Sequence, residues 1–176
     1  HIKNLLCIHC MNKLISMRKF YVTYAGNIGK MQGIETIIFA AEQLKEMLDI
    51  QFVLFGNGRE EGNIRRLIEE KQLTHVQLFP LQPIERISEV YSLGDVSIIS
   101  CKPGTGSAGM PSKTWTIMAC GEVIIGSFDL DSEFTRTIEV AQCGLCTEAG
   151  NPSTLANAIL HLYNAPTQTK IFGKRA

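Results

Sequence analysis

Three glycine-rich segments hold most of the residues that could do chemistry in this 176-residue sequence. Each segment follows a short apolar run and contains at least one lysine or arginine. Glycine allows close backbone approach to a ligand, and backbone amides together with cations suit the negative charge of a pyrophosphate. The candidate binding residues are Gly26, Asn27, Gly29 and Lys30 in the first segment, Gly58 and Arg59 in the second, and Ser107, Gly109, Met110, Lys113 and Thr116 in and after the third.

Three other residues have both a functional and a purely structural interpretation. Gln82 follows the third expected strand and could contact a ligand, although the neighbouring Pro83 is explained equally well by a turn that enters a helix. Glu133 could bind a ligand, but the dipole of an expected helix favours an acidic residue in its first turn anyway. Trp115, the single tryptophan, is expected to pack in the core, with base stacking as the alternative.

The six cysteines raise the question of a metal site. Cys7 and Cys10, like Cys143 and Cys146, have the spacing found in tetrahedral zinc sites. However, Cys143 and Cys146 fall in what resembles a short buried strand, on which residues three apart point to opposite faces. We therefore expect buried thiols and no metal. No serine–histidine–aspartate set and no carboxylate pair identifies a catalytic residue, which stays unknown.

Charge and hydropathy exclude several classes of protein. Lysine plus arginine and aspartate plus glutamate both number 17, so the chain lacks the cationic excess of nucleic-acid-binding proteins. No apolar run approaches the roughly 20 residues needed to cross a bilayer, and the first residues do not resemble a secretory signal. We expect a soluble, cytoplasmic protein that does not bind nucleic acid.

The elements that must position the glycine-rich segments alternate between short apolar runs and helical patterns. This alternation is typical of a parallel sheet covered by crossover helices. Strands are expected at 21–25, 52–55, 75–78, 95–100, 123–126 and 143–146, with helices near 34–48, 64–68, 83–93, 112–120, 131–141 and 152–163. The sequence thus predicts a six-stranded, doubly wound, Rossmann-like α/β domain with helices on both faces. Its ligands would bind at the carboxyl ends of the strands, where the glycine-rich segments fall.

The segments Tyr24–Gly33, Val53–Gly58, Met110–Gly121 and Cys143–Cys146 resemble, in order and spacing, the retaining glycosyltransferases of family four. These enzymes have the GT-B fold of two Rossmann-like domains, and the likeness covers about residues 20–165. It implies that residues 20–165 are the carboxyl-terminal domain, which binds the nucleotide-sugar donor. Residues 1–19 would be a remnant of the interdomain linker, and residues 166–176 the start of a helix that crosses to the other domain.

The same resemblance implies a hexosyltransferase with a UDP-sugar donor and no cofactor or dissociable metal. A missing amino-terminal domain would bind the acceptor, a lipid-linked saccharide, so this fragment alone would be inactive. A looser likeness over Pro80–Ile125 is to bacterial O-antigen transferases that move N-acetyl-L-fucosamine in lipopolysaccharide and surface-polysaccharide synthesis. Such an enzyme could lie peripherally on the inner face of the plasma membrane. Apolar surface left by the absent domain would also allow a dimer.

This sequence departs from the family pattern at several charged positions. Many members have an arginine after the first glycine and a lysine before the later one, where this chain has Asn27 and Gln32. Two family glutamates, eight positions apart, match Ala108 and Thr116. The cations left to contact phosphate are Lys30, Arg59 and Lys113. We expect the phosphate to be held mainly by backbone amides and by Lys113.

Three alternatives remain open on the sequence alone. A UDP-sugar epimerase with the same two-domain architecture would also bind UDP through this domain. A NAD-binding Rossmann domain fits less well, because the first loop reads Gly-x-x-Gly-x-x-x-Gly and Gly56 occupies the place of an acidic ribose partner. An assembly module without a ligand would leave the stretch from Gly104 to Gly109 without a role.

Overall fold

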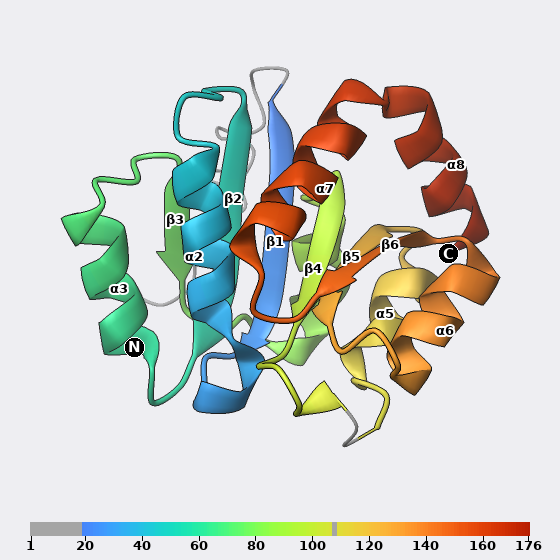
Figure 1. Ribbon diagram of the computed structural model, residues 1–176, viewed down its shortest axis with the longest axis horizontal. Coiled ribbons are helices and arrows are strands. Elements are labelled where there is room, and N and C mark those ends of the chain that lie inside the picture. Colours follow the sequence, from blue (N-terminus) through green and yellow to red (C-terminus); the bar gives the residue numbers. More distant parts are fainter. Residues whose placement is uncertain (1–18, 107–108) are drawn as a thin grey trace.

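The computed structural model describes residues 19–106 and 109–176. The candidate Ser107, the Cys7–Cys10 pair and nearly all of the expected linker therefore lie outside the described residues. Figure 1 shows the remaining chain as one layer of strands with helices packed around it. The strands are β1 (Phe20–Asn27), β2 (Ile50–Asn57), β3 (Val76–Phe79), β4 (Val96–Ser100), β5 (Val123–Phe128) and β6 (Gly144–Glu148).

The six strands form a single parallel sheet in the order β3-β2-β1-β4-β5-β6. This is the strand order of a doubly wound Rossmann sheet, which confirms the predicted fold class. The four central strands, β2, β1, β4 and β5, are buried along nearly their whole length because both faces of a parallel sheet are covered by helices. Strands β2 and β3 extend the sheet on one side of β1, and β4, β5 and β6 extend it on the other. A crevice is therefore expected at the carboxyl ends of β1 and β4, where the strand order reverses.

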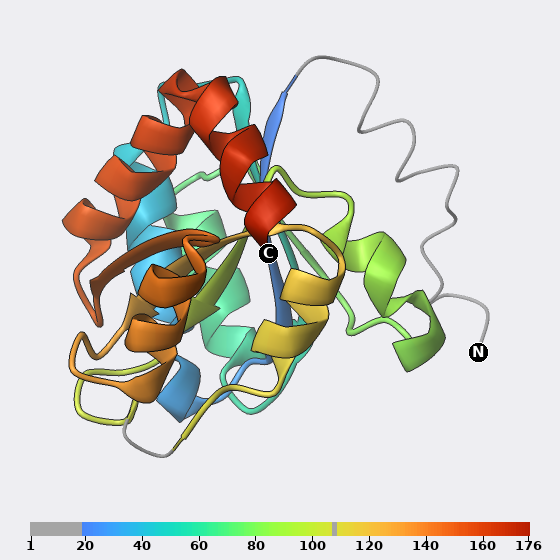
Figure 2. The same cartoon turned by 90° about the vertical axis from the view of Figure 1, so that its right-hand side faces the viewer.

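The helices cover the two faces of the sheet as separate apolar clusters. One cluster joins the sheet to α2, α3 and α7, and the other joins it to α4, α5 and α6. Figure 2 shows α2 and α7 on one side of the sheet and α4 and α5 on the other. The helices are α2 (Ile34–Gln43), α3 (Glu61–Glu70), α4 (Ile87–Tyr91), α5 (Lys113–Ala119), α6 (Glu133–Ala141), α7 (Pro152–Asn164) and α8 (Pro166–Arg175), with 3-10 turns η2 (Lys30–Gln32) and η3 (Ile84–Arg86).

Two helices are shorter than the sequence predicts. The helix expected to reach residue 48 ends at Gln43, and successive turns return the chain to β2, leaving Leu48 70% exposed. The helix expected over residues 83–93 is broken into η3 and α4. In α4 only Val90 and Tyr91 are buried, so little packing is available to stabilise a longer helix.

The carboxyl-terminal stretch forms α8, which packs on the domain described here. Its Phe172 contacts the same apolar cluster as α2 and α7. Gly173 lies against the turn before β5, where a Cβ atom would come within 2.7 Å of the Gly121 carbonyl oxygen. A helix therefore begins where the sequence predicts one, while a crossing to another domain stays a prediction. None of the helices within residues 19–106 and 109–176 is long and apolar enough to span a membrane.

The two carboxyl-terminal cysteines differ from the expectation in one respect. Cys143 lies just before β6 rather than in it, so strand alternation does not separate it from Cys146. Both side chains contact the apolar cluster of α4, α5 and α6, and the prediction that they face opposite sides is wrong. Both thiols are free, and burial raises the pKa of Cys146 to about 11. Across the described part of the chain, no three His, Cys, Asp or Glu side chains are grouped as a metal site would require.

Candidate functional site

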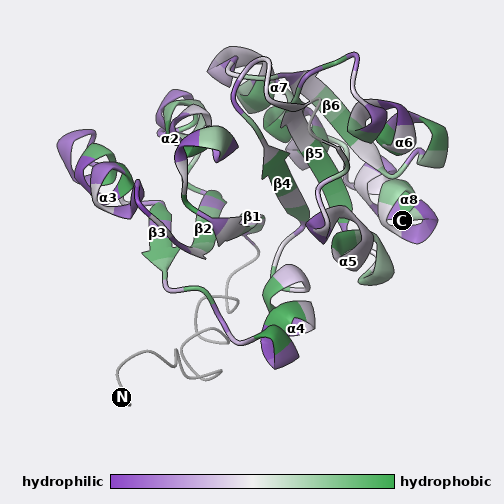
Figure 3. Cartoon of the chain, turned by 90° about the horizontal axis from the view of Figure 1, so that it is seen from below, coloured by the Kyte–Doolittle hydropathy of each residue, from purple (hydrophilic) through white to green (hydrophobic). Residues whose placement is uncertain are grey.

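Two adjoining cavities lie at the carboxyl ends of the strands, the edge onto which Figure 3 looks. Their volumes are about 390 and 460 Å³, and Asn27, Met31 and Gln32 line both. Of the predicted binding residues, Asn27, Gly109 and Lys113 line the first cavity, and Asn27, Gly29, Lys30, Gly58 and Arg59 line the second. The fold thus brings seven candidates from three separate segments of the chain to one place.

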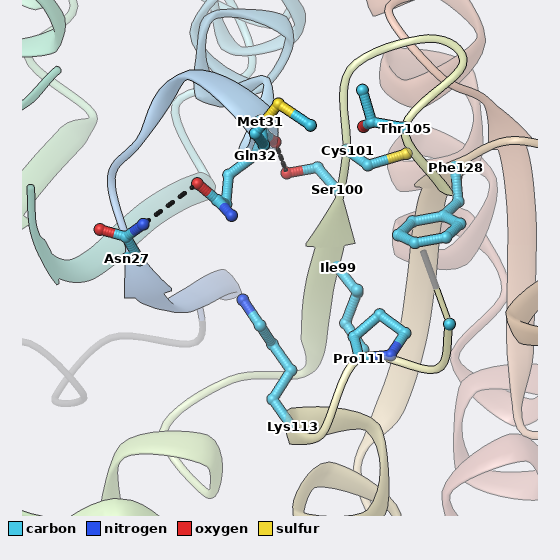
Figure 4. A pocket seen from close by; sticks show the side chains of 11 residues that line it. Asn27, Met31, Gln32, Ile99, Ser100, Cys101, Thr105, Pro111, Lys113 and Phe128 are labelled. Carbon is cyan, nitrogen blue, oxygen red and sulfur yellow. Dashed lines mark hydrogen bonds between the residues drawn. The ribbon is translucent and has the colours of Figure 1, made fainter. Parts of the chain in front are cut away.

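Lys113 supplies the positive charge of the first cavity. It is the first residue of α5, and Figure 4 shows its side chain extending toward the end of β1. The Nζ atom donates a hydrogen bond to the Ala25 carbonyl oxygen at 3.2 Å and lies 4.3 Å from the centroid of the Tyr24 ring. No ion pair among the described residues includes Lys113. Burial without a carboxylate partner lowers the pKa of Lys113 to about 8, because the charged form is poorly solvated there. An anion bound nearby would stabilise the charged form.

Two glycines allow the loops to approach one another this closely. Gly26 has a φ of +151°, and a Cβ atom there would lie 2.7 Å from Lys113 Nζ. Gly58 has a φ of +155°, and its Cβ atom would lie 2.3 Å from the Ile28 carbonyl oxygen. Any larger residue at position 26 would displace the ammonium group, and one at position 58 would separate the loops that follow β1 and β2.

The loop after β1 is held by polar contacts at its start and end. The Asn27 side-chain amide donates to Gln32 Oε1 at 3.3 Å, as Figure 4 shows, and Ser100 Oγ donates to the Gln32 carbonyl oxygen at 2.7 Å. Asn27 and Gln32, which replace the family's arginine and lysine, are therefore hydrogen-bonded to each other. Between them, the Gly29 amide meets no acceptor within the described residues, so it is available to a ligand.

The loop after β4 differs from the expectation. The Gly104 and Gly106 amides donate to the two carboxylate oxygens of Asp129, at 2.9 and 2.7 Å, and the Thr105 hydroxyl donates to the Lys102 carbonyl oxygen at 2.8 Å. Within the protein these three donors already have acceptors, so the part of this loop left to meet a pyrophosphate is the backbone around Gly109. Gly109 is exposed and lines the first cavity together with Thr105 of the same loop.

The first cavity also has an apolar wall. Its lining includes Met31, Ile99, Cys101, Pro111 and Phe128, drawn in Figure 4 around the space that Lys113 enters. Sequence reasoning did not identify these residues, because in the sequence they belong to ordinary strand and loop patterns. A ligand in this cavity would meet a cation on one side and carbon surface on the other.

Besides Gly26, four predicted residues that the structure describes line neither cavity. Gln82 is buried, and its amide donates to the Pro80 carbonyl oxygen at 2.9 Å. Glu133 is exposed at the start of α6 and lines a separate hollow. Met110 packs against the apolar cluster beneath α5, and Thr116 is half-buried on α5.

Trp115 does not pack in the core as expected. Its side chain is 56% exposed, because α5 turns Thr114 and Ile117 inward and leaves Trp115 on the outer side. This places the single tryptophan on the surface, two residues after the lysine that enters the cavity.

Comparison with known proteins identifies the family. The chain matches the family described as glycosyl transferases group 1 over residues 11–176. The chain belongs to this family. Membership in the group 1 glycosyl transferases agrees with the predicted family and does not favour the NAD-binding or epimerase alternatives.

One relative is a putative colanic acid biosynthesis glycosyl transferase, WcaI, from Escherichia coli K12. It is 32% identical over 103 residues, which are 58% of this chain and 25% of the relative. This group 1 glycosyl transferase chain therefore spans only a part of the relative's length.

Two solved structures share its fold. Anabaena HepE in complex with UDP-glucose has a TM-score of 0.79 at 16% identity, over 95% of this chain and 45% of that one. The carboxyl-terminal domain of a group 1 glycosyl transferase, LpcC, from Francisella tularensis has a TM-score of 0.75 at 15% identity, over 97% and 89% of the two chains.

Proposed function

We propose that this chain is the carboxyl-terminal, donor-binding domain of a glycosyltransferase in bacterial surface-polysaccharide synthesis, and that its donor is a UDP-sugar. The observation that carries the proposal is the Lys113 ammonium, which is buried at the cavity without an anionic partner. A diphosphate bound there would form an ion pair with this ammonium and accept a hydrogen bond from the Gly29 amide. The colanic acid relative and the UDP-glucose bound to HepE support the pathway and the donor class.

The chemistry assigned to this domain is electrostatic. As the bond between sugar and phosphate breaks, negative charge grows on the leaving diphosphate, and a cation and amides already in place stabilise it. Lys30 and Arg59, both exposed at the second cavity, would contribute through longer-range attraction. The anomeric configuration is retained, and the catalytic base, if one is used, comes from the acceptor domain or the leaving phosphate.

The apolar wall favours a deoxy sugar as the transferred group. N-Acetyl-L-fucosamine has a methyl group at C6 and an acetyl group on nitrogen, and both could pack on side chains such as Met31 and Phe128. A hexose with a C6 hydroxyl would instead bury a polar group against carbon. This arrangement supports N-acetyl-L-fucosamine as the donor sugar.

The acceptor belongs to the rest of the enzyme. We propose a lipid-linked saccharide, bound by an amino-terminal domain, with the enzyme working in the cytoplasm or peripherally on the inner face of the plasma membrane. The chain described here would then bind the donor weakly and transfer nothing by itself.

Calorimetry tests the donor site directly. We expect UDP to bind the chain more tightly than GDP or ADP, and the Lys113→Met variant to bind UDP about 30-fold more weakly, equivalent to about 2 kcal/mol. Lys102→Met is the matched control, because Lys102 is exposed in the loop that precedes α5 and lines neither cavity. Equal or absent heats for all three nucleotides at millimolar concentration would contradict the proposal.

A further inference from the structure

Tyr24 lies directly beside the cationic end of the cavity, although nothing in the sequence pattern singles it out. Its side chain is fully buried near the end of β1, and its hydroxyl donates to the Asn27 carbonyl oxygen at 2.7 Å. The centroid of its ring is 4.3 Å from Lys113 Nζ, a distance at which the negative face of an aromatic ring attracts an ammonium group.

We propose that Tyr24 is a positioning residue: its ring holds the Lys113 ammonium at the cavity before a ligand arrives. This inference rests on the proposed function, because the ligand in question is the donor diphosphate. Tyr24 itself is buried and lines neither cavity, so it acts through the lysine.

Three contacts limit where the ammonium group can lie. The Tyr24 ring lies on one side, the Ala25 carbonyl oxygen accepts one of its hydrogens, and the missing Cβ of Gly26 leaves the space that it fills. An ammonium group has three N–H donors, so two remain for a ligand. A lysine side chain normally loses considerable rotamer freedom when it binds an anion, and here much of that freedom is already lost in the free protein.

The ring and the hydroxyl of Tyr24 make different contacts, so substitutions can remove one contact and keep the other. The ring contacts Lys113, whereas the hydroxyl ties the ring to the backbone at Asn27. Tyr24→Phe removes only the second contact, and Tyr24→Leu removes both. Phe52→Leu is the matched control for the loss of a buried ring, since Phe52 is fully buried in the same apolar cluster, on β2.

The first measurement needs no ligand. In a chain with ¹³C-labelled lysine, the protons on Lys113 Cε should resonate upfield because of the ring current of Tyr24, with the signal assigned from its loss in Lys113→Met. We expect the upfield shift to persist in Tyr24→Phe and Phe52→Leu and to disappear in Tyr24→Leu. If the shift is absent from the wild type, or survives in Tyr24→Leu, the proposal is wrong.

The second measurement is UDP affinity in a double-mutant cycle. Tyr24→Leu should weaken UDP binding about tenfold and Tyr24→Phe by less than about threefold, but in the Lys113→Met background Tyr24→Leu should change nothing further. An equal loss in both backgrounds would mean that Tyr24 supports the fold rather than the lysine. Should Tyr24→Leu not fold, Gly26→Ala displaces the same ammonium group and should lose both the shift and the affinity. Failure of the wild type to bind UDP would contradict the donor site alone, because the chemical shifts still decide whether Tyr24 places Lys113.

Discussion

The two glycine-rich loops that flank the crevice, 26–33 after β1 and 101–112 after β4, use their backbones in opposite ways. The first leaves the Gly29 amide without an acceptor among the described residues, and it receives its cation from α5. The second directs the amides of Gly104 and Gly106 onto Asp129, so that a carboxylate of the protein itself accepts both hydrogen bonds.

This difference shows that glycine content alone does not identify a ligand-binding loop. In both loops the sequence offers flexible backbone with N–H groups near a cation. The deciding factor is whether a carboxylate from another part of the chain reaches those N–H groups. Asp129 does so from the end of β5, more than 20 residues along the sequence.

Removing Asp129 should have the largest effect on stability. Asp129→Ala leaves two amides without their charged acceptor, and we expect the free energy of unfolding to fall by about 2 kcal/mol and the Tm by about 4–8 °C. Thermal and urea denaturation would measure this loss. Asp131→Ala is the control, since Asp131 is exposed and its carboxylate accepts no hydrogen bond among the described residues. Equal stability of the two variants would show that the second loop does not depend on its internal carboxylate.

The affinity for UDP should fall as the pH rises through the pKa of Lys113. With a pKa of about 8 in the free protein, only about a tenth of the lysines are charged at pH 9, so affinity should drop about tenfold between pH 7 and pH 9. Lys113→Arg should bind with little dependence on pH over this range, because guanidinium stays protonated. A flat profile for the wild type would mean that another group supplies the charge.

The stability of the free protein should change with pH in the opposite direction. Lys113 loses its proton near pH 8 when folded but near 10.5 when unfolded, so between these values the unfolded chain binds more protons. The contribution of this group to the free energy of unfolding therefore rises with pH, by up to about 1.4 kcal/mol per pH unit. Subtracting the urea-denaturation profile of Lys113→Met isolates this term from the titration of cysteines and tyrosines. A difference that falls between pH 8 and 10 would contradict the burial of an unpaired ammonium.

The exposed cations should have the smallest effects. Lys30→Ala and Arg59→Ala should each weaken UDP binding about two- to threefold at low salt, because exposed charges interact weakly through water. The loss should disappear in calorimetry at high ionic strength. A loss as large as that of Lys113→Met would shift the centre of the site to the second cavity.

Most of the fold could be predicted because each strand is a short apolar run followed by a turn. The places where prediction failed depend on contacts between distant residues. The helix expected at 83–93 is broken because only Val90 and Tyr91 find buried partners, which the local pattern could not show. Likewise Trp115 has the composition of a core residue but falls on the outward side of α5.

The candidate site was predicted unevenly for the same reason. Lys113 was found because it follows a glycine-rich loop, and the fold places it at the cavity with Asn27 and Gly109. Tyr24 was not recognised as part of the site, because a tyrosine in a buried strand looks like any other core residue. Tyr24 and Lys113 are nearly 90 residues apart in the sequence, and their contact arises only when the fold brings β1 and α5 together.

The exposed tryptophan of α5 gives the molecule a built-in optical probe. Trp115 is the only tryptophan in the chain, so the fluorescence excited at long ultraviolet wavelengths comes from one position. It lies two residues from Lys113 on the same short helix, with its indole more than half in contact with solvent. A ligand that binds the Lys113 ammonium is therefore expected to change the fluorescence emission of Trp115. This change would allow donor binding to be followed in real time on the unlabelled chain.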